Sequence, residues 1–203
     1  MDKLIDGYRR FRAQGWPERR RLFEMLASAG QSPRAMVLSC ADSRVDPGMI
    51  FDAGPGELFV VRNVANLVPP YAPDGSYHGT SAALEFGVRV LEVSHLLVMG
   101  HAQCGGIRAL LTGVPAEAGD FVAGWIRIAE SARTLALACD DGTDTQLCCE
   151  WETVKLSLAN LMTFPWIRDR VSAGTLTLHG AHFDIHSGAL HLLGPDGRFQ
   201  PMS

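Results

Sequence analysis

Short apolar runs separated by turn-rich segments recur along the chain and predict buried β-strands. The first three have almost no polar alternation, which is typical of strands covered on both faces in a parallel sheet. The last two are joined by a turn at Ser187 and Gly188. The five runs cover residues 35–39, 58–61, 95–99, 175–179 and 189–192.

Segments with helical periodicity lie before and between these runs. Pro17 suits a first helical position and Gly30 the residue just past a helix end, so two helices are predicted near the N-terminus. Strands that alternate with helices predict an α/β fold, in which α-helices flank a mostly parallel central β-sheet. Without an internal repeat or linker, residues 1–203 are expected to form a single domain. The helices are predicted over 2–13, 17–29, 80–91, 121–137 and 145–162.

Composition narrows the class of partner and the compartment. A net charge of −4 argues against nucleic acid or an anionic membrane as the main partner. No stretch approaches the roughly 20 apolar residues of a membrane-spanning helix, and the start of the chain is too polar for a secretory signal. Five cysteines, an odd number, indicate a cytoplasmic chain with reduced thiols, where chemically active cysteines are metal ligands or nucleophiles.

Two polar segments directly follow the first and third predicted strands. Cys40 begins the first segment, and His101 and Cys104 lie in the second. Ligands of open α/β sheets bind at the carboxyl ends of strands, where neighbouring connections diverge, so these side chains are expected to converge. Two thiolates and an imidazole suit zinc and leave a fourth position open, the mark of a catalytic site. Backbone amides of Gly105 and Gly106 are expected to point at the sulfurs.

Asp42 and Arg44 complete the local chemistry of the first segment. A carboxylate two residues after a zinc-bound thiolate can bind the metal and close the site, or accept a hydrogen bond from zinc-bound hydroxide. Arg44 is at the right spacing to hold Asp42 by a charge-assisted bond and keep it off the metal. Taken one at a time, these residues also fit a packed cysteine, a helix cap and a surface ion pair.

Other cysteines and histidines are expected to be structural. Cys139, Cys148 and Cys149 lie in helical, mostly apolar stretches and are interpreted as packing residues. The late histidines straddle a strand and a turn without sharing a helical face, so no metal site is predicted there. They are His179, His182, His186 and His191.

The two segments together resemble the β-carbonic anhydrase family, which carries C-x-D-x-R followed much later by H-x-x-C-G-G. The similarity also covers residues 55–66, 79–86 and 157–161. It implies reversible hydration of carbon dioxide to bicarbonate and a proton by zinc-bound hydroxide, with one zinc per subunit. By the same resemblance, Cys40, His101 and Cys104 are the zinc ligands, and Asp42 and Arg44 are the catalytic dyad.

The resemblance further implies a homodimer, often assembled further, with active sites at the subunit interface and N-terminal helices on the partner. Gln31 matches a glutamine that reaches from the neighbouring subunit to bicarbonate. Phe86 stands where many plant-like members have tyrosine, so any bond from that hydroxyl is missing. The positions that match the rest of the carbon dioxide pocket are Phe59, Val64 and Gly105.

A bicarbonate-regulated subclass of the family carries a tryptophan and a tyrosine at positions matched here by Val37 and Phe183. Arg62 matches that subclass's regulatory arginine but lacks both aromatic partners. The resemblance therefore implies an open zinc site at neutral pH, with Asp42 on the metal only in a closed state. Three other hypotheses remain at this point: hydrolysis of another small electrophile such as carbon disulfide, a non-catalytic zinc protein, and a thiol enzyme using Cys40 or Cys104.

Overall fold

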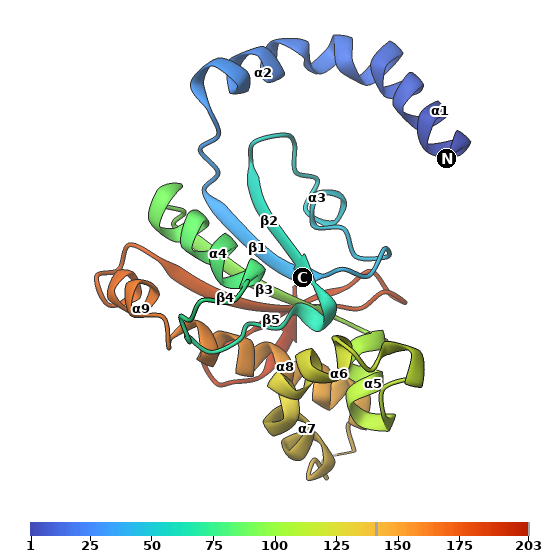
Figure 1. Cartoon of the computed structure of the whole chain (residues 1–203), viewed down its shortest axis with the longest axis vertical. Helices are drawn as coiled ribbons and strands as arrows, with labels where there is room; N and C mark the ends of the chain where they lie inside the picture. Colours follow the sequence, from blue (N-terminus) through green and yellow to red (C-terminus); the bar gives the residue numbers. More distant parts are fainter. Residues whose placement is uncertain (141, 203) are drawn as a thin grey trace.

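A computed structural model of the chain describes residues 1–140 and 142–202. Its centre is a sheet in the order β2-β1-β3-β4-β5-β6, in which the first four strands run parallel and the last two antiparallel (Figure 1). The predicted fold class, a mostly parallel sheet flanked by helices, is confirmed. The strands are β1 (Ala35–Cys40), β2 (Leu58–Asn63), β3 (His95–His101), β4 (Thr177–Phe183), β5 (Leu190–Leu193) and β6 (Phe199–Pro201).

Helices cover one face of this sheet far more than the other. Met36, Leu38, Leu96 and Val98 point from β1 and β3 into the larger core, which three helices close. The opposite face carries a smaller cluster that includes Val37 and reaches only the short helix α3 (Pro47–Ile50). The covering helices are α4 (Gly79–Glu85), α8 (Thr145–Leu161) and α9 (Pro165–Ser172).

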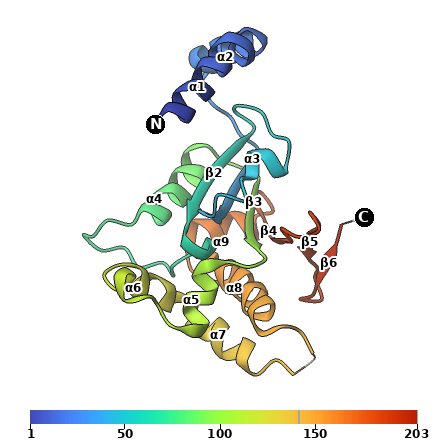
Figure 2. The same ribbon diagram turned by 90° about the vertical axis from the view of Figure 1, so that its right-hand side faces the viewer.

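A second group of helices packs against α8 beside the carboxyl ends of β1 and β3 (Figure 2). Its apolar core reaches Cys40 and Cys104, so the packing of this lobe and the placement of the polar segments depend on each other. The elements of the lobe are α5 (Gly105–Thr112), α6 (Val122–Ile126) and α7 (Glu130–Leu137), with the 3-10 turns η2 (Val64–Asn66), η4 (Ala116–Ala118) and η5 (Arg127–Ala129).

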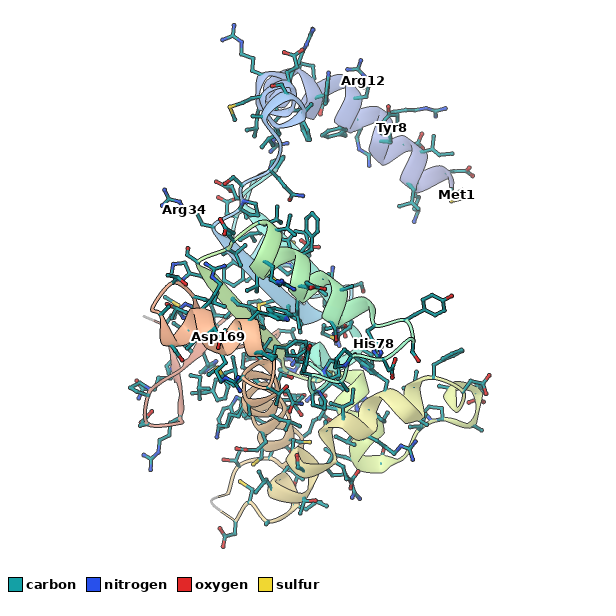
Figure 3. The ribbon with its side chains drawn as sticks, turned by 60° about the vertical axis from the view of Figure 1, so that its left-hand side comes forward. Met1, Tyr8, Arg12, Arg34, His78 and Asp169 are labelled. Carbon is teal, nitrogen blue, oxygen red and sulfur yellow. The ribbon has the colours of Figure 1, made fainter. Side chains whose placement is uncertain are left out.

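The N-terminal helices form an arm that extends away from the sheet (Figures 1 and 3). None of its residues is buried, although Leu26 meets the loop at Gly56. The break predicted between two helices is wrong, because a π-helical turn carries one helix into the next and keeps the backbone hydrogen-bonded. The arm consists of α1 (Asp2–Arg10), η1 (Phe11–Gly15) and α2 (Trp16–Ala29).

Other predicted boundaries shift where local hydrogen bonds replace regular ones. The predicted strand 175–179 begins at Thr177, because the amides of Thr175 and Leu176 donate to the carbonyl of Arg170 instead of a strand. The predicted helix 121–137 is interrupted by η5, and 80–91 ends in a second π turn, η3 (Phe86–Val90). Among the described residues, no helix is long and apolar enough to cross a membrane.

Candidate metal centre and active site

The sheet brings the two polar segments to one point. Cys40 ends β1 and His101 ends β3, and these strands are parallel neighbours. The chain leaves β1 toward β2 and leaves β3 toward β4, on the opposite side, so the connections diverge at this edge. Cys104 follows in the turn that enters α5. The convergence predicted from the strand ends is confirmed.

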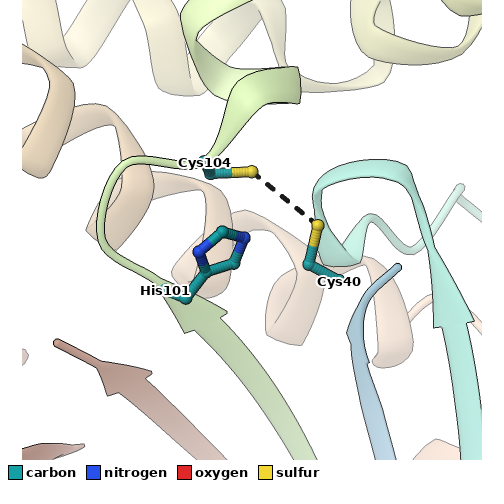
Figure 4. A group of neighbouring side chains, drawn as sticks. All are labelled: Cys40, His101 and Cys104. Carbon is teal, nitrogen blue, oxygen red and sulfur yellow. Dashed lines mark hydrogen bonds between the residues drawn. The ribbon is translucent and has the colours of Figure 1, made fainter. Parts of the chain in front are cut away.

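Cys40, His101 and Cys104 form a compact buried group (Figure 4). Their ligand atoms all lie within 4.8 Å of one another, and the two sulfurs are 3.9 Å apart. His101 Nδ1 lies 2.9 Å from the carbonyl oxygen of Ala102, while its Nε2 is buried without a hydrogen-bond partner. An imidazole held through one nitrogen, with the other unpartnered beside two thiols, fits a zinc site.

The pKa shifts of the three side chains also suit the binding of a positively charged ion. The Cys104 thiol donates toward the Cys40 sulfur and lowers the pKa of Cys40 to about 4. The same pairing, together with burial, raises the pKa of Cys104. Burial disfavours the charged imidazole of His101, but the nearby Cys40 sulfur outweighs that effect and raises its pKa. Cys40 is therefore the more readily ionised of the two thiols, which suits a site for a cation.

Backbone hydrogen bonds favour the thiolate form of both cysteines. Those from Asp42 and Ala65 help to lower the pKa of Cys40, and those from Ile107 and Gly106 oppose the rise in the pKa of Cys104. Of the two amides predicted for this role, that of Gly106 is among them. Ala65 has a φ of 63°, an uncommon conformation for a residue other than glycine. Such strain concentrates at functional sites. Here it accompanies an amide that serves a candidate ligand.

Arg44 holds the Asp42 carboxylate on both oxygens. Its Nε lies 2.9 Å from Oδ1 and its Nη2 lies 2.7 Å from Oδ2. These bonds hold the pKa of Asp42 far below its usual range, so the carboxylate is ionised. Asp42 Oδ2 is 4.0 Å from His101 Nε2, yet Asp42 is not a member of the three-residue group. The Asp42 carboxylate thus lies next to the three-residue group, and its hydrogen bonds to Arg44 hold it outside that group.

Arg62 has a role that sequence reasoning missed. Its guanidinium donates to the carbonyl oxygens of Cys40, at 2.9 Å, and Asp42, at 2.6 Å. It also pairs with Asp46 at 3.0 Å. Arg62 therefore fixes the backbone that carries a candidate ligand and the carboxylate. In the sequence, only its place as a lone arginine in an apolar strand pointed to this role. The resemblance had instead matched Arg62 to a regulatory arginine.

The residues predicted to line the substrate pocket fall into two sets. Val64 lies beside the start of α5 near the group, and Gly105 is the first residue of that helix. The other three lie elsewhere in the chain. Gln31 is exposed before β1, at the far end of the strand from Cys40. The rings of Phe59 and Phe86 contact each other, with centroids 5.9 Å apart.

Gly106 permits a close approach between α5 and the turn η2. A Cβ at this position would lie 2.9 Å from both Ala65 Cβ and Val64 Cγ1. We expect Gly106→Ala to displace the start of α5 together with Cys104, to weaken zinc binding and to lower stability by about 1–3 kcal/mol. Zinc titration and thermal unfolding measure both effects.

Gly105→Ala is the matched control, because a Cβ there meets nothing within 4 Å. An unchanged zinc affinity in Gly106→Ala would show that the contact between α5 and η2 does not position the group.

A three-residue metal group with an ionised carboxylate beside it defines an α/β protein with a metal site of the catalytic kind. A family model described as carbonic anhydrase matches residues 35–190. A carbonic anhydrase of Pseudomonas aeruginosa is 38% identical over 202 residues, covering 98% of this chain and 90% of that protein. The chain therefore belongs to the carbonic anhydrase family, and solved structures place it in the β class.

The structure of the β-carbonic anhydrase CcaA superposes with a TM-score of 0.92 at 35% identity, covering 100% of this chain and 99% of that one. Tetrameric β-carbonic anhydrases of Sordaria macrospora match with a TM-score of 0.82 at 26% identity, covering 100% and 98%. The protein is thus a zinc-dependent enzyme for the reversible hydration of carbon dioxide.

Proposed function

We propose that Cys40, His101 and Cys104 hold the zinc ion and that Asp42 and Arg44 act as the catalytic dyad. The observation that supports this most directly is the unpartnered, buried Nε2 of His101 facing two buried thiols. When bound, zinc makes water acidic enough to supply hydroxide near neutral pH.

Asp42 is proposed to orient that nucleophile. An ionised carboxylate only accepts hydrogen bonds, so the hydrogen of the hydroxide would point to Asp42 and a lone pair would face carbon dioxide. Arg44 occupies both carboxylate oxygens from the side and keeps Asp42 from binding the metal. We therefore propose an open site at neutral pH, in which Cys40, His101 and Cys104 would hold the ion without Asp42 and water could reach it. A crystal structure at neutral pH with Asp42 on the metal would contradict this.

We propose a homodimer as the smallest complete unit. Val64 and Gly105 would line the pocket within one subunit, while Gln31, Phe59 and Phe86 would come from the partner. Gln31 supports this because the whole length of β1, about 20 Å at 3.3 Å per residue, separates it from Cys40 in its own chain. The arm, none of whose residues is buried within one chain, offers contact surface for a second copy.

We also propose a cytoplasmic location. An odd number of cysteines, two of which would serve as zinc thiolates, suits a reducing compartment.

Stopped-flow hydration of carbon dioxide by the zinc-loaded protein between pH 7 and pH 9 tests the function. We expect turnover that is lost when zinc is removed and restored when zinc returns, with substantial activity at the neutral end. Faster turnover of carbon disulfide in competition would identify another electrophile as the substrate. Unfolding on chelation without turnover would indicate structural zinc, and metal-independent activity lost on alkylation would indicate a thiol enzyme.

A further inference from the structure

The turn that presents Cys104 has little regular structure of its own. Gln103 adopts a φ of 58°, and Cys104 is the extended N-cap of α5 without a side-chain cap. A residue other than glycine in this conformation persists only when its surroundings fix it. The position of the Cys104 sulfur therefore depends on contacts from outside the turn.

Glu150 supplies the contact to Cys104 itself. It lies on α8, is 3% exposed, and its Oε1 accepts the backbone N–H of Cys104 at 3.0 Å. The side-chain amide of Gln146, one turn earlier on the same helix, donates to the same oxygen at 3.0 Å and lies 3.4 Å from the carbonyl oxygen of Cys104. Two side chains of helix α8 thus contact the backbone N–H and the backbone carbonyl of Cys104.

His182 fixes the other oxygen of this carboxylate. Its Nε2 lies 3.0 Å from Glu150 Oε2, and the residue is 1% exposed. The ring packs edge-on against Trp151, with centroids 6.3 Å apart, and against Phe199 of β6 at 6.4 Å. A carboxylate this deeply buried is costly unless hydrogen bonds satisfy it. Glu150 meets that condition through one backbone and two side-chain donors.

We infer that Glu150 is a positioning residue for Cys104 and that His182 in turn positions Glu150. The inference rests on the proposed role of Cys104 as a zinc ligand. A hydrogen bond to the Cys104 amide restrains its backbone and therefore the direction in which the sulfur points. Loss of an outer partner of a metal ligand typically lowers metal affinity by about 10–100-fold. Glu150 acts through the backbone of Cys104 and His182 acts through Glu150, so neither is proposed as a catalytic residue.

Zinc release and the spectrum of cobalt-substituted protein test this inference. We expect Glu150→Leu, which has no acceptor for the Cys104 amide, to release zinc to a chromophoric chelator at least about 10-fold faster than the unaltered chain. With Co²⁺ in place of zinc, the thiolate-to-cobalt absorption bands should shift in energy or intensity, because the sulfur changes direction. A change in packing remote from Cys104 would leave these bands in place.

Two substitutions at His182 keep the test decisive if Glu150→Leu does not fold. His182→Phe keeps a ring beside Trp151 but removes the donor to Glu150, and it should release zinc severalfold faster. In His182→Gln, the side-chain amide can donate in place of Nε2, so it should restore the rate and the cobalt bands. Equal behaviour of the two variants would overturn the inference.

Glu130→Gln is the matched control, because Glu130 is a surface partner of Arg133 on α7 and should leave zinc release unchanged. Cys104→Ala separates the inference from the assignment on which it rests. If Cys104→Ala keeps zinc, the ligand assignment fails and this inference fails with it. If Cys104→Ala loses zinc while the Glu150 and His182 variants match the unaltered chain, only the positioning role is overturned.

Discussion

Replacing Asp42 by asparagine is expected to lower the rate of carbon dioxide hydration by about 100-fold or more while leaving zinc bound. Zinc should stay because Asp42 lies outside the group of three side chains that could hold the ion. The rate falls because the amide carries no charge and has a single acceptor oxygen. In the unaltered chain, Arg44 donates to both oxygens of Asp42. An asparagine has one oxygen and one NH₂ group, so it would point a donor instead of an acceptor at either Arg44 or the hydroxide.

Stopped-flow kinetics and zinc content measured on the same preparation check this prediction. Asp196→Asn is a close control, since Asp196 and Arg198 repeat the D-x-R spacing and Asp196 Oδ1 also accepts an amide two residues on, at 3.1 Å. That turn joins the edge strands β5 and β6. Undiminished turnover in Asp42→Asn would refute the assigned role, whereas loss of zinc would make Asp42 a ligand.

The pH dependence of the reaction should not reflect Asp42 near neutrality. The hydrogen bonds from Arg44 lower its pKa, so the carboxylate is ionised both at pH 6 and at pH 9. Lowering the pH through this range therefore removes no charge from Asp42. An activity that rises with pH between 6 and 9 would instead report deprotonation of the water that becomes the nucleophile.

The sheet and the metal group were predictable from sequence because both follow from strand ends. Apolar runs located β1 and β3, and side chains just after neighbouring parallel strands must meet at one edge. Arg44 was equally predictable as the partner of Asp42, because two residues of separation in a turn bring their side chains together. Local spacing was sufficient for these assignments.

The residues that hold the backbone of Cys104 in place were not predictable, because they lie on elements far away in the sequence. Glu150 is one of two acidic residues in a long helix, and its contact with Cys104 depends on how α8 packs beneath the turn. His182 was one of several late histidines, and only β4 and the edge strands show that it is buried. Sequence periodicity identifies which face of a helix is buried, but not which backbone amide that face will meet.

Some predicted ends of helices and strands were wrong for a related reason, because they too depend on individual hydrogen bonds. The two N-terminal helices merge because a π turn absorbs the irregular residues at 11–15 without ending the hydrogen bonding. The predicted strand at 175–179 starts late because Arg170 captures the first amides. In both places the apolar pattern was right, and local backbone hydrogen bonds set the end of the element: they continue through the π turn in the arm, and they go to Arg170 before β4.

Charge placed on the apolar side of the arm is expected to separate the subunits. Leu4, Ile5, Tyr8 and Phe11 recur at helical spacing along α1 and η1, and all four are exposed in the single chain (Figure 3 labels Tyr8). A contiguous apolar face exposed to water on a single chain is typical of a site that binds another protein. We therefore expect it to be buried against a second copy, where Leu4→Asp combined with Tyr8→Asp would leave unpaired carboxylates in an apolar contact.

The double variant should sediment as a monomer at micromolar concentration and lose activity by about 100-fold, because misplaced substrate-positioning groups can cost that much. Lys3→Gln, at a polar position of the same helix, should remain assembled and active. The folded core should be unaffected, since none of the arm residues is buried within one chain.

The coupling between assembly and activity is what this variant measures. Gln31 follows the arm directly, so an arm anchored on the partner would carry Gln31 toward the partner's metal group. A fully active monomer would show that Val64, Gly105 and the dyad suffice within one chain and that Gln31 has no role. A dimer that persists with full activity would show that the subunit contact does not depend on the apolar side of the arm.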